Sequence, residues 1–174
     1  MKAALHREVD TRVLPAKGYA ELIEASADER ASLARFVGVD RIDSLTADVI
    51  VAPWGGDGVR VTGTIDAVVE QSCVVTLEPV RSEISERIDG LYLPTGSPLA
   101  PVGPDGEIMV DAEGDDPPEM FDPPMLDVGA VVTEFLSLAI DPYPRAADAR
   151  LPSEATNERE SPFAALAALK DGSA

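Results

Sequence analysis

The chain has 174 residues and carries 32 acidic against 14 basic side chains, which gives a formal net charge of -18 at pH 7. Its length fits one domain with appended segments, and a single cysteine excludes an intramolecular disulfide framework. Because the sequence shows neither an N-terminal apolar leader nor an apolar run long enough to span a bilayer, we expect a cytoplasmic protein that does not interact with membranes.

The N-terminal part predicts a strand, a short helix and a second strand. Weak alternation through residues 1–24, interrupted by a proline, is typical of an edge strand followed by a turn. Ser26 and Glu29 form a capping-box pattern that opens an amphipathic helix, and Gly38 is the expected helix stop. Residues 42–52 then return to strand-forming side chains.

Residues 59–80 predict the central strand of a sheet. Odd positions are apolar or small and even positions are mostly polar, which is the period of two of a half-buried strand. A Gly-rich turn at 53–58 joins this strand to the preceding one in an antiparallel hairpin. A straight strand over residues 59–77 would span about 60 Å, so we expect a bend or bulge, either at residues 70–72 or at Gly63.

A further strand is predicted after this stretch. Apolar side chains recur there at even positions, namely Val80, Ile84, Ile88 and Tyr92. Glu78-Pro79 is the expected turn before the strand, because proline cannot donate to a central ladder. The three successive strands would then form an antiparallel meander.

Residues 94–124 are rich in proline, glycine and acidic residues, which predicts an acidic loop with at most a short strand at 107–110. The wider section 88–144 contains twelve acidic residues and no Lys or Arg. Such a surface repels phosphate backbones and attracts a basic partner; alternatively, its charge serves only solubility. The spacing of its acidic residues does not fit a calcium-binding EF-hand loop.

Residues 126–140 are the most hydrophobic segment and predict the main helix. Asp127 can cap the N-terminus, and two prolines follow the C-terminus. The helix is too short to span a membrane, so we expect it to lie across the sheet and close the core. The apolar residues at helical spacing are Val128, Val131, Val132, Phe135, Leu138 and Ala139.

After this helix, the composition predicts a flexible linker at 145–160 and a short helix at 161–170. A helix of this length is unstable alone, so it either folds back on its own domain or docks in the groove of a partner. The candidate partner-docking residues are Pro162, Phe163, Leu166, Leu169 and Lys170.

Catalytic patterns are missing from the sequence. The single histidine, His6, lies in a polar context with no Ser or Cys nucleophile at an identifiable spacing. Neither a phosphate-binding P-loop nor a dinucleotide fingerprint occurs, and Asp66 and Glu78 fit surface carboxylates better than an acid–base pair. We therefore predict that the protein is not an enzyme and binds no cofactor.

Three blocks of the sequence read V-T-G-T-I-D-A-V-V-E-Q-S-C-V-V-T-L-E-P-V at 61–80, L-D-V-G-A-V-V-T-E-F-L-S-L-A-I-D-P-Y-P at 126–144 and S-P-F-A-A-L-A-A-L-K at 161–170. In their order and spacing they resemble the YceD family, described as a large ribosomal RNA subunit accumulation protein. The resemblance covers most of residues 26–170. It implies a bacterial cytosolic protein required for normal accumulation of 23S ribosomal RNA.

The family-motif residues in the first block are Gly63, Cys73, Leu77 and Pro79. Many relatives have C-x-R-C-L-x-P, in which two cysteines could contribute to a zinc site, whereas here Thr76 occupies the second cysteine position. One cysteine and one distant histidine cannot supply the four ligands of structural zinc, so we predict no metal site. Cys73 is then interpreted as a small buried apolar residue.

The expected architecture is an α+β fold over residues 1–144. A bent antiparallel sheet, with a half-barrel as its more closed variant, is packed by the 126–140 helix and by a short N-terminal helix. The expected function is that of a non-catalytic factor in 23S ribosomal RNA accumulation, acting through a basic ribosomal protein or assembly factor. The alternative is a direct RNA-binding module whose N-terminal basic residues, Lys2, Arg7, Arg12 and Lys17, contact the RNA.

Overall fold

The computed structural model describes residues 5–100 and 117–150. Within them, a five-stranded sheet has the order β2-β3-β4-β5-β6, and a separate two-stranded ribbon pairs β1 with β7. The strands are β1 (Glu8–Asp10), β2 (Tyr19–Glu24), β3 (Arg41–Trp54), β4 (Gly58–Ser72), β5 (Pro79–Pro94), β6 (Glu119–Phe121) and β7 (Met125–Asp127). The helices are the 3-10 turn η1 (Thr11–Val13), α1 (Ala27–Val37) and α2 (Val128–Ala139).

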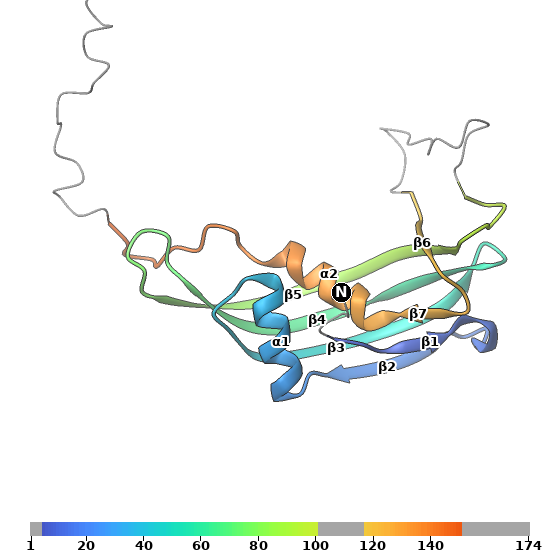
Figure 1. Ribbon diagram of the computed structural model, residues 1–174, viewed down its shortest axis with the longest axis horizontal. Helices are drawn as coiled ribbons and strands as arrows, with labels where there is room; N and C mark the ends of the chain where they lie inside the picture. The colour runs from blue at the N-terminus through green and yellow to red at the C-terminus, as the bar shows by residue number, and fades with distance from the viewer. Residues whose placement is uncertain (1–4, 101–116, 151–174) are drawn as a thin grey trace, which may run out of the picture.

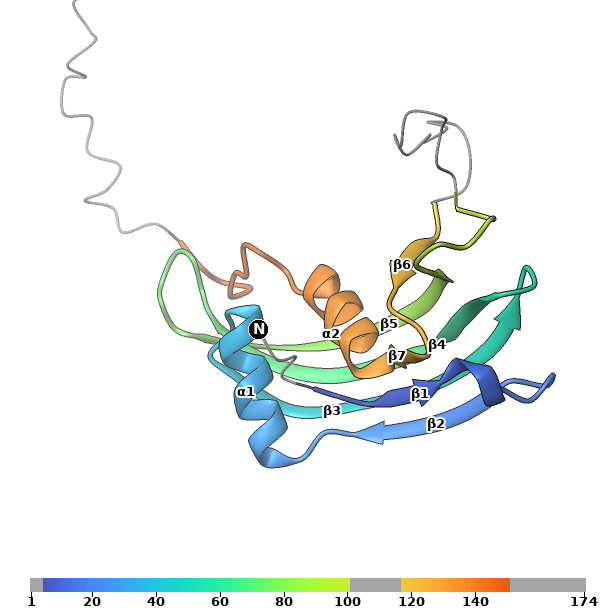
Figure 2. The ribbon, with the colours of Figure 1, turned by 45° about the vertical axis from the view of Figure 1, so that its right-hand side comes forward.

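The main sheet is a curved trough. Its neighbouring strands are antiparallel except for β5 and β6, which are parallel. Both helices and the β1–β7 ribbon lie on the concave side of the trough (Figures 1 and 2). This confirms the predicted α+β fold, with a bent, mostly antiparallel sheet that stays open.

The core lies between the concave face and α2. Along β4, the inward side chains of Val59, Val61, Ile65, Ala67 and Val69 are all buried, as the period of two predicts. The long β3–β4–β5 meander is likewise confirmed by the antiparallel pairing of β4 with both neighbours along its length.

The position of the bulge was predicted wrongly. β4 pairs with β5 from Val59 to Ser72 without a register shift, and the irregularity lies on β3, between Ile42 and Ser44. Strand β4 ends at Ser72 and is therefore shorter than the predicted strand segment, which continues to residue 77. Its turn is formed by residues 74–76 rather than by Glu78-Pro79, since Pro79 already begins β5.

Both helix starts follow the sequence signals. Ser26 accepts a hydrogen bond from the Glu29 backbone N–H, and the Glu29 side chain accepts from the Ser26 backbone N–H, which completes the capping box of α1. Helix α1 ends at Val37, and Gly38 follows as its left-handed C-cap, as predicted. Asp127 caps α2 by accepting from the Ala130 N–H at 3.3 Å.

The buried face of α2 differs in part from the predicted one, since Phe135 and Ala139 are only partly buried. Leu138 was expected in the core but is 78% exposed, and Leu136 is fully buried instead. Thr133 is also buried, and its hydroxyl donates to the Gly129 carbonyl at 2.8 Å, so no polar atom is left unpaired there. The helix is therefore rotated relative to the face that the apolar spacing indicates.

The ion pair between Arg7 and Glu29 ties the N-terminal segment to the start of α1. Arg7 Nη1 donates to Glu29 Oε1 at 2.8 Å, and this bond, together with that from Ser26, lowers the pKa of Glu29 from 4.5 to about 2. A carboxyl group with a depressed folded pKa stabilises the fold above its unfolded pKa, and this contribution is lost as the pH falls through about 2.

We therefore expect Glu29→Gln to lower the free energy of unfolding by about 1 kcal/mol at pH 6, a value that allows for solvent screening. The difference from the unmodified protein should shrink between pH 4.5 and pH 2. Urea unfolding at several pH values measures it, with Glu24→Gln, an exposed acid on β2, as the control. A pH-independent difference would contradict the assigned role of the ion pair.

Candidate partner-binding cleft

The four family-motif residues do not form one pocket. Cys73, Leu77 and Pro79 belong to the β4–β5 connection or its border, whereas Gly63 lies in the middle of β4. Leu77 has a left-handed backbone conformation (φ 62°) and an exposed side chain. Since a leucine rarely adopts this conformation, the connection carries local strain.

Cys73 is fully buried, as predicted, but its sulfur is more than an apolar atom. Sγ accepts hydrogen bonds from the backbone N–H groups of Val75, Thr76 and Ala146 at 3.4, 3.5 and 3.4 Å. The Thr76 side chain, followed by these N–H groups, lowers the pKa of the thiol from 9.0 to about 7. Cys73 thus joins the β4–β5 connection to the segment that follows α2.

Replacing Cys73 by alanine should lower the melting temperature, because three N–H groups lose their acceptor. A thiol with a depressed folded pKa contributes stability above its unfolded pKa and loses it as the pH falls through about 7. The loss in Cys73→Ala should therefore be larger at pH 9 than at pH 6. Thermal unfolding followed by circular dichroism checks this, with the half-exposed Val74→Ala as the control. Equal losses at both pH values would argue against thiolate stabilisation.

Residues 5–100 and 117–150 contain no group of three or more His, Cys, Asp or Glu side chains placed to hold a metal ion. The histidine is engaged elsewhere, since His6 Nδ1 lies 2.6 Å from Asp127 Oδ2.

Two of the three described N-terminal basic residues, Arg7 and Arg12, pair with neighbouring acids, whereas Lys17 has no ion pair within the described residues. Arg7 pairs with Glu29, and Arg12 contacts Asp10 through two nitrogens at 3.0 and 2.6 Å. Lys2 and the C-terminal docking residues 162–170 lie outside the described residues, as does the predicted strand at 107–110. The described N-terminal arginines therefore do not present unpaired charge to an RNA backbone.

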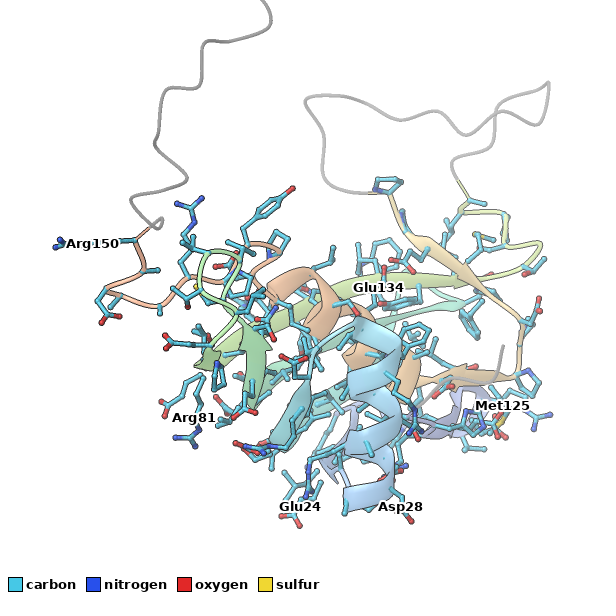
Figure 3. All side chains as sticks on the ribbon, turned by 60° about the vertical axis from the view of Figure 1, so that its left-hand side comes forward. Glu24, Asp28, Arg81, Met125, Glu134 and Arg150 are labelled. Carbon is cyan, nitrogen blue, oxygen red and sulfur yellow. The ribbon has the colours of Figure 1, made fainter. Side chains whose placement is uncertain are left out.

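A hollow that the sequence did not predict lies where β5, β6 and α2 meet, with Trp54 of β3 and Arg60 of β4 also in its lining. It has a volume of about 630 Å³ and is called the acidic cleft below. Glu134 on α2, labelled in Figure 3, lies alongside β5 and lines the cleft. The other lining residues are Trp54, Arg60, Asp89, Gly90, Leu91, Tyr92, Pro117, Glu119, Phe135 and Leu138.

Electrostatics distinguish this cleft from the remaining surface. Burial, followed by the charge of Glu134, raises the pKa of Glu119, and burial with both carboxylates raises the pKa of Tyr92. Arg60 is already engaged, because its guanidinium donates to both Asp89 oxygens at 2.8 Å. The field at the Tyr92 end of the cleft is therefore negative and uncompensated.

Neither α1 nor α2 in the described part is long and apolar enough to cross a membrane.

Fold and site together define an α+β protein whose curved sheet carries helices on its concave side and an acid-lined cleft at one margin. The chain belongs to the YceD family, described as large ribosomal RNA subunit accumulation protein, which it matches over residues 61–170. The match contains β4 from Val61 on, the Cys73 connection, the strands β5 to β7 and α2, and it extends to residue 170. No curated protein and no solved structure matches the chain significantly.

Proposed function

We propose that this protein is a non-catalytic factor that supports 23S ribosomal RNA accumulation, and hence large-subunit biogenesis, by binding a basic ribosomal or assembly protein in the cytoplasm. The family description supports the connection with large-subunit ribosomal RNA. The choice of a protein partner rests on charge, because the chain carries -18 and its 88–144 section lacks Lys and Arg altogether.

The observation that carries the proposal is the lack of neutralisation in that acidic section. Six of its acids lie in the described residues, where Asp89 pairs with arginines and Asp127 contacts His6. Four carboxylates are left without an ion-pair partner there: Glu119, Asp122, Glu134 and Asp141. The described N-terminal arginines, in contrast, are paired internally, so electrostatic attraction favours a basic protein over a nucleic acid.

The C-terminal segment serves in this proposal as a second anchor. Its Phe163, Leu166 and Leu169 would add apolar contacts to an interaction that is otherwise electrostatic. Two linked contacts raise the overall affinity through effective concentration, even when each contact is weak.

Sedimentation of ribosomes from cells lacking the protein tests the biological role. We expect a lowered ratio of large to small subunits that is restored by the full chain. An unchanged ratio would contradict a role in large-subunit biogenesis.

The partner class is tested by capture of ribosomal components from lysate at low salt, with the full chain and with a chain lacking residues 161–174. We expect basic ribosomal or assembly proteins to be retained, and fewer without the C-terminal segment. A gel shift with 23S fragments and purified protein tests the alternative of a direct RNA-binding module. We expect no shift without an added protein partner, and a shift under these conditions would favour direct RNA recognition.

A further inference from the structure

The hydroxyl group of Tyr92 is a buried polar atom without a hydrogen-bond partner in the described residues. Tyr92 is 4% exposed and lines the acidic cleft, and its ring folds back over Gly90 of its own strand. A Cβ at Gly90 would lie 2.8 Å from Tyr92 Oη, so only glycine leaves room for this position. An unpaired buried hydroxyl costs free energy, which makes Tyr92 Oη a site prepared for a ligand that donates hydrogen bonds.

Two carboxylates converge on the same region from different elements. Glu119 lies opposite Tyr92 in the β5–β6 register, and Glu134 comes from α2. The charges of both carboxylates raise the pKa of Tyr92, and the charge of Glu134 also raises the pKa of Glu119. A positive charge placed among them would relieve their repulsion, whereas a phosphate or carboxylate would add to it.

The rest of the lining is suited to the alkyl part of a long cationic side chain. Phe135 and Leu138 from α2, together with Pro117, supply apolar surface beside the carboxylates. Leu138 is largely exposed, so its side chain is available to contact a ligand in the cleft. Lysine and arginine characteristically bury such a stem along apolar surface while their charged heads meet acidic groups.

The cleft is also open to an extended chain. β6 pairs only with Tyr92–Pro94 of β5, and in the described residues no strand lies beside β5 on that side before Tyr92. A segment approaching along this margin would reach the cleft without displacing any described strand.

We propose that the acidic cleft binds the side chain of an arginine or lysine in an extended basic segment of the partner protein. Its cation would lie between Glu119 and Glu134 and donate a hydrogen bond to Tyr92 Oη. This inference rests on the proposed function for the identity of the partner, but its chemistry is independent of the ribosome. It accounts for the unpaired hydroxyl, the two uncompensated carboxylates and the exposed Leu138 at one place.

Titration of the ¹⁵N-labelled full chain with a peptide probe tests the proposal by NMR. The probe is an acetylated Gly-Ser-Gly-Leu-Arg-Leu-Gly-Ser-Gly amide, and its matched control replaces arginine by citrulline, which is neutral and nearly isosteric. A third peptide contains lysine instead. We expect saturable shifts of the amides of Tyr92, Glu119 and Glu134 with the arginine or lysine peptide, and at least about tenfold weaker binding of the citrulline peptide.

Two matched double variants distinguish specific binding in the cleft from nonspecific attraction to an acidic protein. Glu119→Gln/Glu134→Gln should weaken the cationic peptide by about tenfold or more. Asp66→Asn/Glu83→Gln removes the same charge from two exposed acids on the convex face and should change the affinity less than twofold. Equal losses in both double variants would overturn the proposal in favour of nonspecific attraction.

Tyr92→Phe should affect stability and peptide affinity differently. Removing an unpaired buried hydroxyl should leave the melting temperature unchanged or higher, while the affinity for the cationic peptide falls. A lower melting temperature with unchanged affinity would assign Tyr92 a purely structural role and overturn its part in binding.

The chain itself also contains cations beyond residue 150, at Arg159 and Lys170. If Arg159→Gln/Lys170→Gln binds the peptide several-fold more tightly than the unmodified chain, the cleft belongs to the chain's own tail and the partner assignment is overturned.

The experiments distinguish failure of the cleft proposal from failure of the proposed function. Peptide binding without capture of ribosomal components contradicts the proposed function alone, and normal capture by Glu119→Gln/Glu134→Gln contradicts the cleft alone.

Discussion

Replacing Leu136 by alanine is expected to lower the free energy of unfolding by about 3 kcal/mol. Leu136 is fully buried in the core between α2 and the concave face of the sheet. Truncation removes apolar contacts and leaves a cavity that a long, continuously paired meander cannot readily close. Guanidinium unfolding, followed by circular dichroism at several wavelengths, measures the change.

Leu138→Ala is the matched control, because it removes the same atoms two residues further along the same helix. With 78% of Leu138 exposed, we expect a change within about 0.5 kcal/mol. The two variants together fix the rotation of α2. If Leu138→Ala cost as much as Leu136→Ala, the face of α2 that packs on the sheet would be the one indicated by sequence periodicity, and Leu138 would not line the acidic cleft.

The difference between the two leucines shows where sequence reasoning reaches its limit. Helix α2 is apolar on most sides, so its spacing predicts a helix but does not select the face that packs. The face is set by tertiary contacts: Gly129 lies so close to the Leu5 backbone that a Cβ would approach its carbonyl oxygen to 2.7 Å. Such an approach fixes the helix from its N-terminal end and places Leu136 inward.

The sequence predicts those features correctly that depend only on neighbouring residues. The capping box of Ser26 and Glu29 and the Asp127 cap each need only neighbouring residues, and the alternation in β4 reflects one buried face. The short strands β6 and β7 have three residues each, which is too few to show a period. Strand β5 begins at Pro79, the partner of Ser72, because of its pairing with β4 rather than because of its composition.

The acidic cleft could not be predicted for a similar reason. Tyr92, Glu119 and Glu134 are far apart in sequence and come from β5, β6 and α2. In the sequence, Tyr92 is only the last apolar residue of an even-numbered series and Glu119 one of many acids in a proline-rich stretch. Neither pattern indicates that the hydroxyl is left unpaired next to two carboxylates, because that is a property of the assembled elements.

Gly63→Ala is expected to be among the most damaging single substitutions, lowering the free energy of unfolding by about 3 kcal/mol or more. A Cβ at Gly63 would lie 2.2 Å from the Asp48 carbonyl oxygen and 2.9 Å from Val49 Cα. Both atoms belong to the backbone of β3, so the clash cannot be relieved by a side-chain rotation and must separate two central strands. The entropic gain from replacing glycine in the unfolded chain, about 0.4–1 kcal/mol, is smaller than this loss.

Hydrogen exchange distinguishes local separation of β3 and β4 from general loss of stability. We expect faster exchange for amides near Val49 and Gly63 in Gly63→Ala than for amides near Ile42 and Val69, at the other end of the same strand pair. Thr64→Ala, an exposed neighbour on β4, should cost at most about 1 kcal/mol and leave this pattern unchanged. If Gly63→Ala were as mild as Thr64→Ala, the close approach of β3 would not be the reason for glycine at the centre of this strand.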